Sequence, residues 1–207
     1  MREIATTLTD YLLTVLCTLC VWRLVTTGVA TRLRGAVVFF TGFAAASFFG
    51  GTWHGFFSTG QGLAQQVIWW LSMLFAGVTA AGLALTGLKL LGMSRERLPL
   101  IVIGVLLGVY AVFAWRDPRF LVPLVASLAG TTLCVAGLVQ RLRQPDNRGA
   151  KLLLAALGVS ILAAVAQQQG VALHAPHFDH NATYHLALIP ALGLAYAGFR
   201  HLAIHPQ

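Results

Sequence analysis

Seven long apolar stretches, separated by short polar connections, constrain this chain more than any other feature of its sequence. A helix needs about 20 mostly apolar residues to cross the hydrocarbon core of a membrane. The stretches that meet this length lie at residues 5–25, 35–57, 63–88, 98–115, 120–139, 150–171 and 182–203. The connections leave no room for a soluble domain. We therefore predict an all-α membrane protein, in which residues 1–207 form a single bundle of seven transmembrane helices.

The composition agrees with this class. Hydrophobic residues make up 57% of the 207 positions and charged residues only 10%, against about 25% charged residues in an average soluble protein. The first apolar stretch begins after Arg2 and Glu3, runs through Val25 and contains no signal-peptidase site of small residues. We expect it to be a retained helix and not a cleaved signal peptide.

The basic residues predict the orientation of the bundle. With seven spans, the connections 23–34, 89–97 and 141–151 share one side with the C-terminus, and the remaining connections share the other side with the N-terminus. Eleven Lys and Arg residues fall on the first side and only Arg2, Arg116 and Arg119 on the second. The positive-inside rule then predicts an outside N-terminus and a cytoplasmic C-terminus, most simply in a bacterial inner (plasma) membrane. The net charge of +8 is explained by these connections, and we expect no nucleic-acid partner.

Three ionisable residues inside the spans point to a site. Asp10 lies early in the first span, His54 late in the second and His185 early in the seventh. Because successive helices alternate in direction, these positions come to the same outer face. Ionisable groups are expensive in lipid and usually mark a functional site. We predict that all three line one cavity in the outer half, with Gln65 or Gln66 and Gln168 near its rim.

The environment of His54 has two interpretations. Gly42, Ala46, Gly50 and His54 recur every four residues, so they share one helix face. Small residues at this spacing allow neighbouring membrane helices to approach closely, which would turn His54 toward the bundle. The alternative is that His54 reaches out to the membrane interface beside Trp53.

The position of Asp10 also has two interpretations. If the first helix begins near Thr9, Asp10 is a helix-start residue that interacts with the positive end of the helix dipole. If the helix begins near Ile4, Asp10 lies inside the span and needs a partner, and a histidine at the same depth is the obvious one.

Histidines are concentrated before and at the start of the seventh span, as in a metal site. His174, His177, His180 and His185 fall within a short segment, but their spacing does not match a zinc-finger pattern. The first two lie in the connection, where we expect them to be solvated. His185 lies one helical turn after Asn181.

These features resemble the CREST superfamily of seven-helix membrane proteins. The resemblance consists of a histidine late in the second helix and of a seventh helix that begins Asn181-Ala182-Thr183-Tyr184-His185, followed by Pro190. The superfamily includes alkaline ceramidases, adiponectin/progestin receptors and Per1-like proteins. The chain looks like a divergent bacterial-type member, and its outward N-terminus is similar to that of the ceramidase branch.

The resemblance implies a zinc ion held by one histidine of the second helix and by two of the seventh. His54 and His185 match two of these ligands, Asn181 stands at the third position, and His180 or Asp10 could complete a variant site. The family's serine position is Gly50, with Ser47 one turn deeper, and its aspartate position is Gln65.

Two functions follow as hypotheses. In the first, the protein is an outward-facing, metal-dependent hydrolase that cleaves an amide or ester bond of a membrane lipid. A metal held by His54, His180 and His185 would activate a water molecule, Asp10 would act as general base or orient a ligand, and Ser47 and Gln65 would occupy the remaining catalytic positions.

In the second hypothesis, the protein is a non-catalytic, lipid-binding or receptor-like seven-helix protein. Asp10, His54 and His185 then form a structural hydrogen-bonded network, which is stable when each member has a partner. The replacements at Gly50, Gln65 and Asn181 favour this second function.

Overall fold

The computed structural model describes residues 3–60, 62–93, 97–117, 119, 121–174 and 177–204. Within these ranges the fold is helical, apart from an isolated bridge between His174 and Phe178. The helices are α1 (Ile4–Thr26), α2 (Val29–Arg32), α3 (Arg34–Thr52), the π-helix η1 (Trp53–Phe57), α4 (Leu63–Leu90), α5 (Arg97–Arg116), α6 (Leu121–Leu142), α7 (Arg148–Gln168) and α8 (His180–Ile204).

The seven predicted helices are confirmed. Seven helices are long and apolar enough to cross a membrane, with α3 and η1 together forming the second. Their bounds differ from the expected stretches by at most three residues. The short helix α2 and the π-helix were not predicted, because both depend on local hydrogen bonds that hydropathy does not report.

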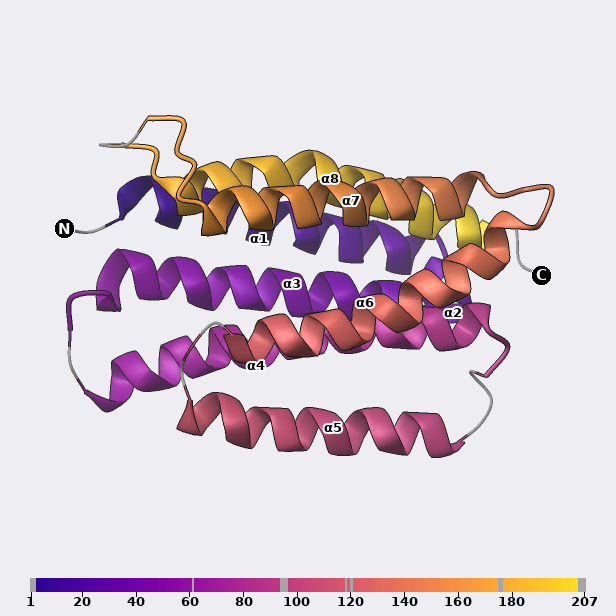
Figure 1. The fold of residues 1–207 in the computed structure, drawn as a ribbon, viewed down its shortest axis with the longest axis horizontal. Coiled ribbons are helices and arrows are strands. Elements are labelled where there is room, and N and C mark those ends of the chain that lie inside the picture. Colours follow the sequence, from indigo (N-terminus) through magenta and orange to yellow (C-terminus); the bar gives the residue numbers. More distant parts are fainter. Residues whose placement is uncertain are drawn as a thin grey trace.

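The long helices alternate in direction, so the bundle has two distinct ends (Figure 1). We call the end that holds the N-terminus and the start of α8 the N-end. The opposite end, with α2 and the C-terminus, is the C-end. Asp10, His54 and His185 all lie toward the N-end, as the alternation predicts.

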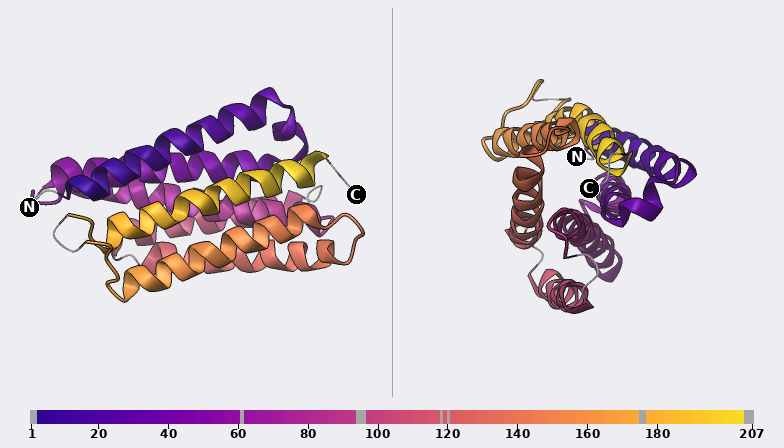
Figure 2. Two further views of the ribbon diagram at one scale, coloured as in Figure 1. Left: turned by 90° about the horizontal axis from the view of Figure 1, so that it is seen from above. Right: turned by 90° about the vertical axis from the view of Figure 1, so that its right-hand side faces the viewer.

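Six helices form a ring, and α5 lies outside it. Viewed along the bundle, α7, α8 and α1 form one layer, α3 and α4 lie beneath it, and α6 connects the two layers (Figure 2). Contacts follow the order α3–α4–α6–α7–α8–α1–α3, with the α6–α7 contact the least extensive. The ring surrounds a core that contains Phe40, Leu138, Leu153 and Phe199.

Glycines allow a close approach between α3 and α4, which have the most extensive contact of any two helices. A Cβ added at Gly82 would collide with the backbone of Phe39, and one at Gly35 would lie 2.7 Å from the carbonyl oxygen of Gly82. Close backbone approach through small residues is typical of helices that associate within membranes.

Side-chain hydrogen bonds to backbone carbonyl groups connect α5 to α4. The Tyr110 hydroxyl donates to the carbonyl oxygen of Met73 at 2.5 Å. In return, Trp70 Nε1 of α4 donates to the carbonyl oxygen of Ala111 at 2.9 Å. These bonds fix one face of α5, while the rest of its surface is exposed.

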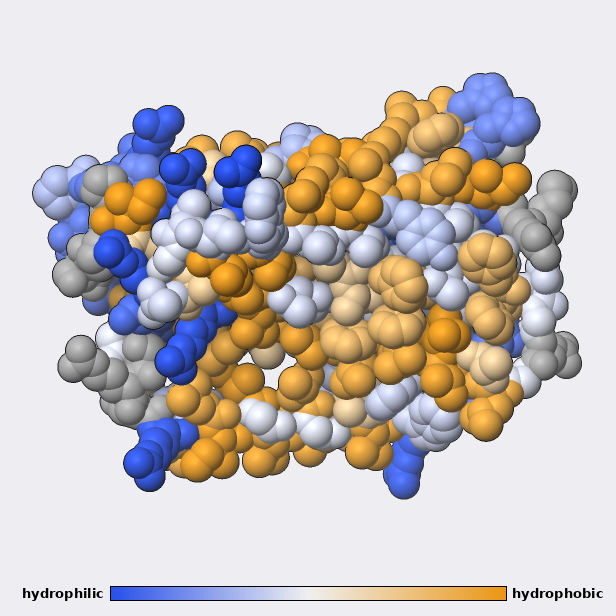
Figure 3. All heavy atoms as spheres, turned by 180° about the vertical axis from the view of Figure 1, so that it is seen from behind, coloured by the Kyte–Doolittle hydropathy of each residue, from blue (hydrophilic) through white to orange (hydrophobic). Residues whose placement is uncertain are grey.

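The surface has the distribution expected of a membrane-crossing bundle. Hydrophobic side chains cover the middle of the face shown in Figure 3, and hydrophilic side chains gather toward its ends, above all at the C-end. The exposed hydrophobic side chains include Leu8, Leu98, Leu106 and Leu162, each at least 60% exposed. In water this surface would be a large association site.

Candidate functional site

Asp10 and His185 form the centre of the polar cluster at the N-end. Helix α1 begins at Ile4, so Asp10 lies in its second turn and is not a capping residue. Its side chain is 6% exposed, that of His185 is 12% exposed, and Asp10 Oδ1 lies 3.5 Å from His185 Nε2. The interpretation of Asp10 as a buried acid with a histidine partner is therefore confirmed.

Hydrogen bonds around Thr9 fix the proton on His185. The Thr9 hydroxyl has one proton, which it donates to the carbonyl oxygens of Ala5 and Thr6 at 2.9 and 3.0 Å. It must therefore accept its third bond, of 3.1 Å, from His185 Nδ1. With Nδ1 protonated, the contact between Nε2 and Asp10 is attractive only when a proton lies on one of the two groups.

His54 points toward the bundle, but its acidic partner is Glu3. His54 Nδ1 lies 2.6 Å from Glu3 Oε2, and the two side chains are 14% and 35% exposed. The two atoms are buried but poorly aligned for a hydrogen bond. The prediction of an inward His54 is confirmed, whereas Asp10 is not its direct partner.

A π-helix presents His54 at this position. The last turn of the second span widens into η1, and such bulges are frequent at functional sites. Gly51 and Gly55 bring this segment against α1, because Cβ atoms there would lie 2.9 Å from Asp10 Cβ and from Thr7 Cγ2. Residues with side chains would separate η1 from α1.

Asp179 connects the start of α8 to α1. Its Oδ1 accepts a hydrogen bond from the backbone N–H of Ala182 at 2.8 Å, as an N-cap does. The same oxygen accepts a bond of 3.0 Å from the Thr6 hydroxyl. His54 and His185 interact electrostatically with each other and with Asp179. The two acid–histidine pairs therefore belong to one cluster.

Gly50, which the CREST resemblance aligns with a serine, lies directly against the cluster. A Cβ at Gly50 would be 3.4 Å from both Asp10 Oδ2 and the hydroxyl of Ser72, which comes from α4 and donates to the carbonyl oxygen of Ala46 at 3.0 Å. Ser47 is buried on α3. The space beside Gly50 is therefore bordered by Asp10 on one helix and by Ser72 on another.

Asn181 is engaged by another amide. Gln167 Nε2 of α7 donates to Asn181 Oδ1 at 2.8 Å, which joins the end of α7 to the start of α8. His180, the first residue of α8, is exposed. Gln65 lies half-buried in the first turn of α4, and Gln66 and Gln168 are exposed.

The connection between α7 and α8 carries the other two histidines. The rings of His174 and His177 stack with centroids 5.4 Å apart, and both residues are exposed, as expected. Pro176, which separates them, lies outside the described residues. This pair does not join the cluster around Asp10.

The arrangement does not fit a zinc ion. His185 uses both ring nitrogens on Thr9 and Asp10, and His54 Nδ1 faces Glu3. In the described part of the chain, no three His, Cys, Asp or Glu side chains are placed to hold a metal ion. Catalytic zinc typically has three protein ligands and an open position, so His54 and His185 would have to leave their present partners to bind one.

Fold and site together define the class: a seven-helix bundle, apolar enough to cross a membrane, with acid–histidine pairs at one end. The chain belongs to the DUF6962 family, a family of unknown function, which matches residues 5–204. No curated protein and no solved structure matches the chain.

Proposed function

We propose that this chain is a multi-pass protein of the bacterial inner membrane with its N-end outside and its C-end in the cytoplasm. The seven long apolar helices and the excess of basic residues in the C-end connections support this orientation. Membrane lipids are then its immediate surroundings, and the polar cluster lies in the outer half.

Within that membrane, we propose a non-catalytic, lipid-binding or receptor-like protein in which the cluster is structural. The observation that carries this proposal is the pairing of each buried imidazole with a carboxylate: His185 with Asp10 and His54 with Glu3. The pairs bring together α1, η1 and α8. The two pairs join helices that lie far apart in the sequence, a structural role in helix packing that requires no substrate.

The test is an assay for lipid hydrolysis by the purified protein. Vesicles of phosphatidylethanolamine and, separately, ceramide are incubated with the protein, and released fatty acid is measured by mass spectrometry. We expect no release above that of a His185→Gln variant prepared in parallel. Release that depends on His185 would overturn the non-catalytic proposal.

A metal-dependent lipid hydrolase, as the CREST resemblance implies, is the second candidate. It is favoured by the convergence of Asp10, His54 and His185 on one end of the bundle. Elemental analysis of folded protein, purified without a polyhistidine tag, distinguishes the two functions. About one zinc per chain, lost in His54→Ala and His185→Ala, would favour the hydrolase, and a metal content near zero would exclude it.

A further inference from the structure

The C-end of the bundle carries most of the basic residues of the protein and few of its acids. Eleven Lys and Arg residues lie toward this end with two acids, Glu96 and Asp146, whereas three basic residues and four acids lie toward the N-end. We call the exposed basic side chains that the structure describes at the C-end the basic surface: Arg23, Arg32, Arg34, Lys89, Arg97, Arg143, Arg148, Lys151 and Arg200. The C-end is therefore strongly positive, whereas the charges at the N-end nearly balance.

The orientation of the bundle in a membrane does not explain the shortage of acids at the C-end. Orientation depends on Lys and Arg residues, and Asp and Glu have little influence on it. Acids among the basic residues would leave the orientation unchanged, yet Asp146 is the only acid in the described part of this end. A surface with so few acids attracts anions over its whole extent. An anionic partner accounts for this feature, whereas orientation does not.

The type of basic residue favours a partner that carries phosphate. Nine of the eleven basic residues toward the C-end are arginines, and only Lys89 and Lys151 are lysines. Either residue type would set the orientation. The planar guanidinium group, however, can donate two parallel hydrogen bonds to one phosphate, whereas the ammonium group of lysine acts as a point charge.

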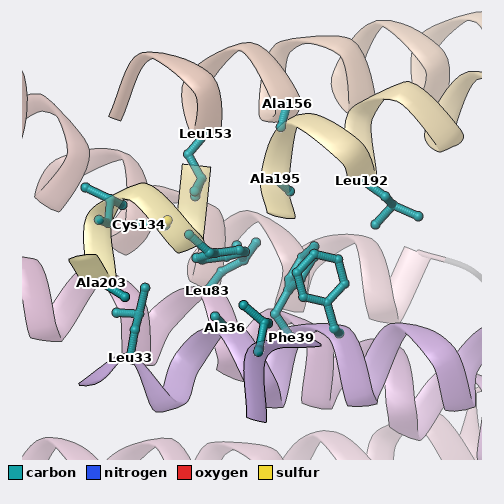
Figure 4. Packing of buried hydrophobic residues seen from close by; sticks show 14 of the residues in the cluster. Leu33, Ala36, Phe39, Leu83, Cys134, Leu153, Ala156, Leu192, Ala195 and Ala203 are labelled. Carbon is teal, nitrogen blue, oxygen red and sulfur yellow. The ribbon is translucent and has the colours of Figure 1, made fainter. Parts of the chain in front are cut away.

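The side chains of the basic surface are available to such a partner. Among the residues that the structure describes, none of these nine side chains forms an ion pair with an acid. Arg23 lies over the ring of Trp22 at 5.1 Å, and Arg32 donates to the carbonyl oxygen of Ala203 at 3.4 Å. Leu33, which follows Arg32, and Ala203 are both buried in the core (Figure 4). Core packing therefore holds the backbone here, while the arginine side chains remain exposed.

Exposed apolar side chains border the basic surface. Trp22 and Val25 flank Arg23 on α1, and Ile204 lies one turn after Arg200 on α8; all three apolar side chains are exposed. On the face shown in Figure 3, the hydrophilic C-end adjoins the hydrophobic middle of the bundle. A phospholipid has the same order, because its charged head group is joined to apolar chains. A soluble anion would need no apolar surface beside the arginines.

We propose that the basic surface binds the head groups of anionic phospholipids, such as phosphatidylglycerol, in preference to zwitterionic phosphatidylethanolamine. This inference rests on the membrane location in the proposed function and names the lipid chemistry that the C-end selects. An anionic head group offsets the repulsion among the arginines. The ammonium group of phosphatidylethanolamine neutralises its phosphate and is itself repelled by the positive surface.

The experiment measures which of two lipids the protein binds. The full-length protein in detergent is mixed with equal amounts of phosphatidylglycerol and phosphatidylethanolamine with identical acyl chains, and bound lipids are counted by native mass spectrometry. The C-end variant Arg148→Gln/Arg200→Gln removes two charges of the basic surface. The control Arg116→Gln/Arg119→Gln removes two exposed charges at the N-end, so both variants lose the same net charge.

We expect the unmodified protein and the control to bind about threefold more phosphatidylglycerol than phosphatidylethanolamine, and the C-end variant to lose at least half of this preference. More concentrated ammonium acetate should also reduce it, because salt screens exposed charges. Thermal unfolding shows whether each variant is folded; if the C-end variant is not, Arg143→Gln/Lys151→Gln replaces it.

Three results would overturn the proposal. The first is equal binding of the two lipids by the unmodified protein, and the second is the same preference in the control and the C-end variant. The third is displacement of phosphatidylglycerol by glycerol phosphate in a parallel sample, which would show that a soluble anion is the ligand.

Failure of this inference is distinguishable from failure of the proposed function. Equal binding of the two lipids removes the selectivity of the C-end and leaves the lipid-hydrolysis result unaffected. Conversely, hydrolysis that depends on His185 removes the non-catalytic function even when anionic lipids bind at the C-end.

Discussion

Helices α5 and α8 differ in how much of their surface is buried against the rest of the protein, and the difference is the reverse of what their hydropathy would suggest. The most apolar 18-residue segment of α5 has a mean hydropathy of 2.4, and 11% of it is buried. The corresponding segment of α8 has a mean hydropathy of 1.4, and 44% of it is buried. In a soluble protein the more apolar helix would be the more buried one. The reversed order is expected in a membrane, where lipid is as apolar as a protein core and helices associate through packing and polar contacts.

Their contacts show the same contrast. Helix α8 reaches α1 through the His185–Asp10 pair and the Asp179–Thr6 bond at its N-end. Helix α5 has two bonds with α4, through Tyr110 and Trp70, and lies at the edge of the bundle (Figure 2). Substitutions in the ring should therefore have larger effects than similar substitutions on α5.

The largest difference between the ring and α5 is expected for glycine substitutions. Gly82→Val places a side chain against the backbone of Phe39, which cannot move without separating α3 from α4. We expect a loss of more than about 3 kcal/mol of stability, and most of the protein should elute as aggregate in size-exclusion chromatography. The control is Gly104→Val on α5, where a Cβ meets no atom within 4 Å; this variant should elute like the unmodified protein.

The second difference concerns the buried acid. Asp10→Ala leaves His185 Nε2 without its partner, at a cost of about 1–3 kcal/mol, measured as a lower Tm in detergent. In a double-mutant cycle with His185→Ala, we expect a coupling of about 1 kcal/mol or more. Additive effects of the two substitutions would contradict the pairing.

Asp117 provides the matched control, because its carboxylate is exposed and pairs with Arg119 in a connection. Hydrogen bonds from Arg119 lower the pKa of this carboxyl, so Asp117 stays charged at neutral pH. Since exposed ion pairs contribute little to stability, Asp117→Ala should leave the Tm unchanged.

A smaller effect is expected where α5 joins α4. Tyr110→Phe removes the hydroxyl that donates to the Met73 carbonyl oxygen and keeps the ring in place. We expect a loss of about 1 kcal/mol. Relative to the unmodified protein, limited proteolysis of the variant should become faster near the ends of α5 but not near α8. An equal increase in cleavage rate at both helices would show that α5 is not held in place separately.

The smallest effect is expected on the outer surface of α5. Leu106, which is 60% exposed, should tolerate replacement by alanine with no measurable change in Tm, because its side chain packs against little of the protein. Leu138→Ala in α6 is the reference: Leu138 is fully buried, and truncation leaves a cavity that costs about 2 kcal/mol or more. A large effect of Leu106→Ala would indicate that another protein surface covers α5.

The seven long helices, their approximate bounds and their alternating directions could all be predicted from the sequence. Hydropathy and helix length are properties of continuous segments, so they can be read without knowing the neighbours. The same alternation was sufficient to place Asp10, His54 and His185 at one end. The helical spacing of Gly42, Gly50 and His54 favoured a His54 that faces the bundle, because residues four apart share one helix face, but it left the membrane interface open as an alternative.

The contacts between side chains of different helices could not be predicted in this way. The Thr6–Asp179 and Thr9–His185 bonds join residues more than 170 positions apart, and the rotation of each helix about its axis depends on its packing. Glu3 was not predicted as the partner of His54, because it precedes the first span and their contact depends on how η1 packs against α1. Ser72 was not predicted near this site because its place beside Gly50 depends on how α4 packs against α3. Hydropathy cannot report such contacts, since each depends on the shapes of two helices at once.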